Sequence, residues 1–171
     1  MQFDIRNTFH KREIQTQAKE WLAASYWQRP FAVTLTLKQR LPDTGHRIDT
    51  ISASQNVRHF ANLLSRRCFG TAYKRHGRRI QMFSVLESGV KKRLHVHAMV
   101  DCPRADLELA FPEVIRAAWG ETRWGYRQGD VQPCNDGWLS YQLKLRDKPE
   151  FDIALDWQNC QLNEHGTSDR V

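Results

Sequence analysis

The sequence predicts an α+β domain, a two-layer sandwich in which helices pack against a central antiparallel sheet. Three observations predict this class. Several segments carry apolar residues three and four positions apart, which is the spacing of a buried helix stripe. Other segments alternate apolar and polar residues, as a strand with one buried face does. The two kinds of segment are interleaved along 171 residues, a length that suits a single domain.

The first helix and the first strand are expected between residues 10 and 38. Residues 10–27 have apolar residues at helical spacing, and Pro30 ends that segment. Residues 31–38 then alternate cleanly, which predicts a strand. The polar face of this strand carries Thr34, Thr36 and Lys38. Turn-forming residues at 40–50 predict a loop after it.

A second helix and a hairpin are expected next. Ser52 or Ser54 can cap a helix that ends near Gly70. A basic connector then leads to a strand at residues 80–87, and a turn returns the chain antiparallel into a strand at residues 92–100. The two strands of this hairpin are therefore expected to be neighbours in the sheet.

The second half of the chain adds a helix at residues 111–119, an irregular strand at 123–132 and a helix at 137–146. The order α-β-α-β-β-α-β-α around one antiparallel sheet indicates a ferredoxin-like arrangement. We expect one domain over residues 1–160, followed by a polar tail at 161–171. Edge-packing positions near the end of the domain are expected at Phe151, Ile153, Leu155 and Trp157.

The composition indicates a soluble, cytoplasmic protein. No run of 18 apolar residues and no basic-then-apolar amino terminus is present, so no membrane span or signal peptide is expected. The four cysteines are at least 26 residues apart, which argues against a zinc knuckle and gives no disulfide framework. A reducing compartment is therefore expected.

The positive charge of the chain is concentrated in its first part. The net charge is +7, yet residues 1–100 carry 18 Lys and Arg against 6 Asp and Glu, whereas residues 101–171 carry 8 against 13. No acidic residue occurs between Asp49 and Glu87, where seven Arg and Lys residues lie. Although a solvated basic face is the simpler explanation, an acid-free stretch of this length favours binding to a phosphate backbone.

Two histidines stand on the otherwise apolar strand at residues 92–100. Because side chains alternate along a strand, His95 and His97 project to the same face. Glu87 ends the preceding strand, and an antiparallel register that pairs it with His95 puts the carboxylate on that face too. A five-residue loop over residues 89–93 gives this register. Glu87, His95 and His97 are therefore candidate metal ligands.

Two imidazoles and one carboxylate suit Mg²⁺ or Mn²⁺ acting on a phosphate. The same three residues could hold Zn²⁺ in a hydrolase. A pair of ordinary strand histidines and a solvated carboxylate is the alternative, because a His-x-His pair alone is a weak signal. The basic surface favours the phosphate interpretation.

A Tyr-x-x-Lys sequence follows on the last predicted helix. Tyr141 and Lys144 are three residues apart and so share a helix face. A phenol is a poor nucleophile at neutral pH unless a cation favours its phenolate, and Lys144 could supply that cation. A packed tyrosine beside a solvated lysine is the alternative.

These features, taken together and in order, resemble the HUH endonuclease superfamily, and specifically the single-tyrosine rolling-circle replication initiators of plasmids and small single-stranded DNA viruses. The resemblance covers residues 30–146 and rests on the strand at 31–37, on Glu87 with His95-Val96-His97, and on Tyr141-x-x-Lys144. It implies that the acid and the two histidines bind Mg²⁺ or Mn²⁺, which polarises the scissile phosphate. It also implies that Tyr141 attacks to leave a 5′-phosphotyrosine and a free 3′-OH, assisted by Lys144.

Two features of the family are missing from this sequence. No second tyrosine accompanies Tyr141 at helical spacing, which argues against a two-tyrosine mechanism, and no Walker sequence for a helicase occurs. The tyrosine follows the histidines, whereas in relaxases it is an amino-terminal feature.

The function expected from this resemblance is that of a site-specific endonuclease and strand transferase acting on single-stranded DNA, with an origin hairpin as the expected substrate and a monomer as the expected form. Trp124, Tyr126 or Tyr73 could stack bases. The residues expected to contact DNA are Thr34, Thr36, Lys38, Arg66, Arg67, Lys74, Arg75, Arg78, Arg79, Lys91, Lys92 and Arg93. The alternatives are a single-tyrosine transposase, a non-enzymatic nucleic-acid-binding module and, more remotely, a zinc hydrolase of small substrates.

Overall fold

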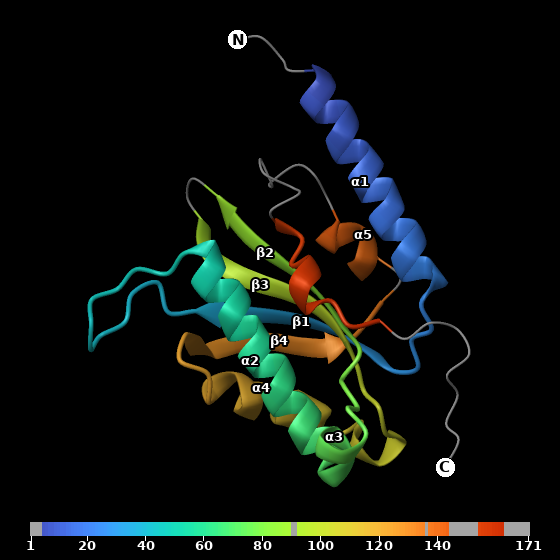
Figure 1. Ribbon diagram of the computed structural model, residues 1–171, viewed down its shortest axis with the longest axis vertical. Coiled ribbons are helices and arrows are strands. Elements are labelled where there is room, and N and C mark those ends of the chain that lie inside the picture. Colours follow the sequence, from blue (N-terminus) through green and yellow to red (C-terminus); the bar gives the residue numbers. More distant parts are fainter. Residues whose placement is uncertain (1–4, 90–91, 136, 144–153, 163–171) are drawn as a thin grey trace.

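The computed structural model has an α+β architecture built on one four-stranded sheet (Figure 1). It describes residues 5–89, 92–135, 137–143 and 154–162. The strands are β1 (Pro30–Leu37), β2 (Met82–Gly89), β3 (Lys92–Asp101) and β4 (Gly125–Pro133). They lie in the order β2-β3-β1-β4, and all neighbours are antiparallel. The predicted α+β class and antiparallel sheet are confirmed.

Two crossovers build this sheet. The chain leaves β1 through α2 (Thr50–Phe69) and the short α3 (Thr71–Arg75) to reach β2, and β3 then inserts between β1 and β2. In the same way, α4 (Phe111–Gly120) connects β3 to β4, with β1 between them. Each crossover is a split βαβ unit. The sequence predicted these elements in this order, except that the basic connector before β2 contains the short helix α3.

The larger core lies between the sheet and the helices α2 and α4, which Figure 1 shows crossing one face. Alternate residues of β1 and β3, such as Val33 and Val96, are buried there, as the period of a strand requires. Phe60 of α2 and Trp119 of α4 meet edge to face, 5.4 Å between ring centroids. Trp119 also donates its indole N–H to the Thr36 carbonyl, which ties α4 to β1.

A smaller core lies on the opposite face, next to β2. It is formed by α1 (Ile5–Ala24), α5 (Trp138–Gln142) and residues 154–162, and it buries Ala18, Leu22, Phe83, Val85, Leu143 and Leu155. Gln15 of α1 donates to the Leu143 carbonyl, so α1 and the end of α5 are joined directly. This core covers part of the second face, and the candidate ligands lie on the same face beside it.

Residues 154–162, hereafter the C-terminal strap, run along the free edge of β2. Met82 and Gln161 exchange backbone hydrogen bonds of 2.8 Å, and the Asp156 N–H donates to the Ser84 carbonyl. The strap thus covers an edge that would otherwise expose unpaired backbone groups. The predicted packing of Leu155 is confirmed, whereas Trp157 is 44% exposed, and Phe151 and Ile153 lie outside the described residues.

The predicted cap of α2 was wrong. The cap is Asp49, whose carboxylate accepts a 2.7 Å hydrogen bond from the Ser52 N–H, while Ser52 and Ser54 lie inside the helix. Asp49 has the extended backbone of an N-cap, and its side chain satisfies an amide in the first turn. This hydrogen bond to Ser52 also holds the pKa of the Asp49 carboxyl below its ordinary value.

Candidate active site

The β2–β3 hairpin places Glu87 directly opposite His95 and Val85 opposite His97, as predicted. The predicted five-residue loop, however, was wrong. Gly89 pairs with Lys92, and the register shifts between Glu87 and Gly89. An extra residue in one strand, as in a β-bulge, accounts for such a shift. Because the irregularity lies beyond Glu87, the carboxylate keeps the same face as the two imidazoles.

The three candidate ligands converge on one point. One donor atom from each of Glu87, His95 and His97 lies within 4.8 Å of the others. The Nε2 atoms of the two histidines are 3.1 Å apart, and Glu87 Oε2 is 3.4 Å from His97 Nε2. Glu87 is 1% exposed and His97 4%. Such a buried group of nitrogen and oxygen donors could bind a metal ion, and we call it the metal group.

The outer ring nitrogens fix how the two imidazoles face this point. His95 Nδ1 lies 2.8 Å from the Arg93 carbonyl. A carbonyl only accepts, so a neutral His95 carries its proton on Nδ1 and presents a lone pair at Nε2. His97 Nδ1 is 3.1 Å from the Thr34 hydroxyl. Histidines that bind metals usually have such a partner on the other nitrogen. The donor set therefore fits a divalent metal.

The polar face of β1 lies beside the histidines. Thr34 pairs with His97 and Thr36 with His95. The Thr36 hydroxyl donates to the Gln128 carbonyl, and the Lys38 ammonium donates to the Arg123 carbonyl at 2.9 Å. Thr34 was predicted to contact DNA, but its hydroxyl contacts His97 instead. It therefore supports the orientation of that ring.

Tyr141 lies against the metal group from α5. Its ring centroid is 5.5 Å from that of His97, the planes are nearly perpendicular at 89°, and the residue is 45% exposed. The expectation that the tyrosine would lie on the same side of the sheet as the histidines is confirmed. Lys144 falls outside the described residues, so its position relative to Tyr141 stays a prediction.

Trp138 fixes α5 on this face. Its ring stacks on Tyr141 at 5.4 Å and contacts His97 at 5.6 Å. Its indole N–H donates to the Ala98 carbonyl of β3 at 3.2 Å. Trp138 was not among the predicted site residues. The signal that it belongs to the site was its position three residues before Tyr141, which puts both rings on one helix face.

Most of the predicted basic DNA contacts do not line this site. Six of them are exposed at the end of α2 and around α3: Arg66, Arg67, Lys74, Arg75, Arg78 and Arg79. This segment enters β2 at Met82, five residues or about 17 Å of strand from Glu87. Arg93 is exposed on the hairpin beside His95, whereas Lys91 and the Lys92 side chain are outside what the structure describes.

Two of the three aromatic residues suggested for base stacking are unsuited to it. Trp124 is only 8% exposed and belongs to the larger core. Tyr73 is half-buried, and the Arg79 guanidinium lies over its ring at 4.2 Å. Tyr126 on β4 is 48% exposed. Of these three aromatic residues, only Tyr126 is open to solvent.

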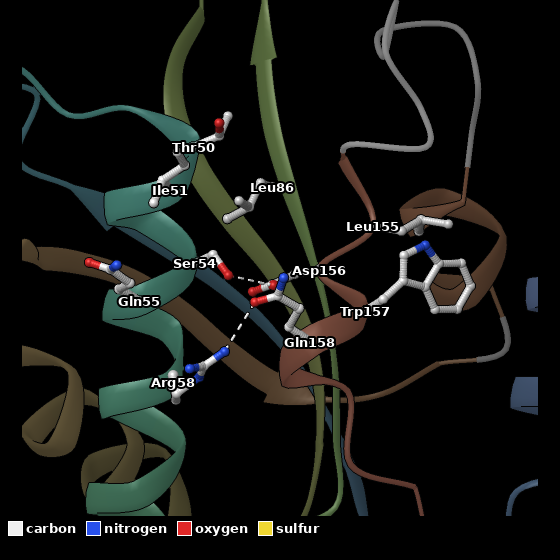
Figure 2. Close-up of a pocket in the computed structure, with 10 residues that line it drawn as sticks. All are labelled: Thr50, Ile51, Ser54, Gln55, Arg58, Leu86, Leu155, Asp156, Trp157 and Gln158. Carbon is white, nitrogen blue, oxygen red and sulfur yellow. Dashed lines mark hydrogen bonds between the residues drawn. The ribbon is translucent and has the colours of Figure 1, made fainter.

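A separate cleft of about 390 Å³ lies between α2 and the C-terminal strap (Figure 2). Polar side chains bridge its walls. Ser54 donates to Asp156 at 2.7 Å, and Arg58 donates to Gln158 at 3.1 Å. Leu86 also lines it, and its side chain points to the face of β2 opposite Glu87. The cleft is therefore distinct from the metal group.

Comparison of the chain with models of known protein families, with curated proteins and with solved structures found no match. Among the described residues, no helix has both the length and the apolar character needed to cross a bilayer. The functional assignment therefore depends on the geometry of the site.

Proposed function

We propose that this protein is a metal-dependent endonuclease and strand transferase that acts on single-stranded DNA, with a ferredoxin-like domain of the HUH type. The observation that carries the proposal is the contact of the Tyr141 ring with His97, on the face where Glu87, His95 and His97 converge. A candidate nucleophile and a candidate metal group thus lie side by side, although they are separated by more than 40 residues of sequence.

In this proposal Glu87, His95 and His97 would hold a Mg²⁺ or Mn²⁺ ion, and the bound ion would supply Lewis-acid polarisation of a phosphate. The Tyr141 hydroxyl oxygen forms a bond to phosphorus as the bond to the 3′ oxygen breaks. The phenolic proton passes to solvent and the leaving 3′ oxygen takes up a proton from solvent, so the departing strand ends in a 3′-OH. The 5′ side stays on Tyr141 as a phosphotyrosine. Attack by another 3′-OH reverses the step and joins the strands, which is the transferase activity.

Lys144 has the proposed role of favouring the phenolate or offsetting charge in the transition state. The aromatic pair of Trp138 and Tyr141 supports single-stranded DNA as the substrate. Tyr141 is nearly half exposed, and unpaired bases stack on such rings.

The test is to incubate the protein with pooled single-stranded oligonucleotides and Mn²⁺ and to look for covalent adducts on a denaturing gel. The wild type is expected to form an adduct whose 5′-linked sequence can be read, and Tyr141→Phe is expected to form none. Tyr126→Phe, which removes a hydroxyl from another exposed tyrosine, is expected to behave as the wild type. If Tyr141→Phe still forms the adduct, the proposed mechanism is wrong. Chelator-insensitive binding with no adduct from the wild type would favour a non-enzymatic binding module.

A further inference from the structure

A strongly basic surface lies at the carboxyl end of α2 and around α3. It consists of Arg66, Arg67, Lys74, Arg75, Arg78 and Arg79, all exposed, and we call it the basic end. It has no acidic residue within its own sequence. Arg67 forms an ion pair with Glu121. In the described part of the chain, no carboxylate lies within ion-pair distance of Arg66, Lys74, Arg75 or Arg79. Much of this charge is therefore available to an anionic partner.

The basic end does not belong to the nuclease face. It follows α2, which packs on the face of the sheet opposite the metal group. It also lies at the end of β2 where Met82 pairs with Val100, whereas Glu87 lies at the hairpin end. Figure 1 shows α3 at the opposite end of the sheet from the β2–β3 hairpin. One short strand of DNA bound over Tyr141 would not reach it.

The position of the aromatic rings at the basic end favours double-stranded over single-stranded DNA as its partner. The Arg78 guanidinium lies over Phe69 at 5.2 Å, and that of Arg79 over Tyr73 at 4.2 Å. Both rings are half-buried, so a base would have to displace an arginine to stack on either one. Surfaces for single strands combine cations with open aromatic rings, whereas a duplex presents its phosphates and keeps its bases stacked inside. The basic end offers cations alone.

We propose that the basic end is a second nucleic-acid site, which binds the phosphate backbone of double-stranded DNA while the sheet face acts on a single strand. The choice of DNA over RNA rests on the proposed function, but binding at this end needs neither the metal nor Tyr141. It would hold the duplex that flanks a single-stranded cleavage site.

The test measures fluorescence anisotropy of a short blunt-ended DNA duplex with wild-type protein in EDTA, over a range of salt concentrations. The double variant Lys74→Gln/Arg75→Gln removes two exposed cations, neither of which lies over an aromatic ring. Two lost phosphate contacts are expected to weaken duplex binding at least tenfold near 0.1 M salt and to reduce the salt slope by about 1.8. Affinity for a short single strand is expected to change less than twofold.

The matched control removes the same charge from α1, through Arg12→Gln with Lys19→Gln, both exposed. It should leave duplex affinity within twofold of the wild type. The proposal is overturned if the control loses as much affinity as the Lys74 and Arg75 variant, if single-strand affinity falls as far as duplex affinity, or if an RNA duplex of the same sequence binds more tightly. Because the readout is binding in EDTA, failure of the nuclease proposal would leave this result unaffected.

Discussion

His97 depends on a neighbour that is not itself a candidate ligand. Its Nε2 faces Glu87 and His95, while its Nδ1 contacts the Thr34 hydroxyl on the adjacent strand. A free imidazole can turn and can place its proton on either nitrogen. The Thr34 contact selects one orientation before any metal binds, and such outer partners typically change metal affinity tenfold to a hundredfold when removed.

Thr34→Val should therefore weaken Mn²⁺ binding by about tenfold or more, measured by isothermal titration calorimetry without DNA. Valine preserves the shape and β-branching of threonine but cannot hydrogen-bond to Nδ1. Thr36→Val is the matched control, because that hydroxyl donates to the Gln128 carbonyl and contacts neither histidine in the structure. Mn²⁺ affinity within twofold of the wild type in Thr34→Val would contradict the role given to this hydroxyl.

The sequence was enough to predict the ligands but not this support. Alternation along a strand places His95 and His97 on one face, and the parity of a hairpin adds Glu87. Thr34 could be assigned only once β1 was known to lie beside β3 in the register that pairs it with His97. That pairing joins residues 63 positions apart, and periodicity alone does not specify which distant strands meet.

At the scale of elements, one buried carboxylate ties the C-terminal strap to α2, in addition to the backbone hydrogen bonds between the strap and β2. Asp156 accepts hydrogen bonds from Ser54 of α2 and from Asn159 of the strap, each at 2.7 Å. Burial raises the pKa of Asp156 above its ordinary value, against the opposing effect of these hydrogen bonds. Cys160 lies beside it and contacts the Asp156 carbonyl through its thiol. Burial raises the pKa of that thiol to about 12, so the thiol reports whether the strap is closed.

Asp156→Ala is expected to loosen the strap, because Ser54 and Asn159 lose their common acceptor. At pH 8 a thiol with a pKa of about 12 is almost never ionised, whereas one near 9 is about a tenth ionised, so opening exposes a far more reactive group. Alkylation of Cys160 by iodoacetamide, mapped by mass spectrometry, should be at least tenfold faster than in the wild type.

Two controls separate opening of the strap from other effects. Asp156→Asn removes the same charge but keeps an acceptor oxygen, so it should accelerate the alkylation of Cys160 much less than Asp156→Ala does. Cys68 of α2 is buried, and burial also raises the pKa of its thiol to about 12. The alkylation rate of Cys68 should stay unchanged. Equal acceleration at Cys68 would mean that the whole domain had loosened and would argue against a local strap.

Elements were predicted better than their junctions. The segment chosen for the helix at residues 111–119 matches α4, because its apolar stripe repeats over nearly three turns. The hairpin loop and the cap of α2 were wrong, since each depends on one local hydrogen bond among several that the sequence allows. Edge packing near the end of the domain was predicted, but the strand that it covers was not, because β2 lies some 70 residues earlier and shares no distinctive pattern with the strap.

At the scale of the whole molecule, the basic first part of the chain contributes to two separate surfaces, the basic end and the sheet face with the metal group. The uneven charge predicts a polyanionic partner, but composition could not show where the cations would lie. The crossover through α2 and α3 carries the basic end to the far end of β2, away from the hairpin with the metal group. Charge is a property of the sequence, whereas its position relative to the site is set by the topology of the sheet.

The metal group joins β2 and β3 directly and β1 through Thr34, so a bound ion should stabilise the domain as a unit. A ligand that binds only the folded protein adds about 2.7 kcal/mol at a hundredfold excess over its Kd, which raises Tm by roughly 5–10 °C in a chain of this size. Mn²⁺ should produce this shift in the wild type without DNA, measured by differential scanning calorimetry, and EDTA should reverse it.

Glu87→Gln, which keeps the shape of the side chain but removes a charged ligand, should lose most of the shift. Glu113→Gln, the same change on an exposed residue of α4, should keep it. An undiminished shift in Glu87→Gln would mean that Mn²⁺ binds elsewhere, and that the convergence of Glu87, His95 and His97 is only a hydrogen-bonded cluster.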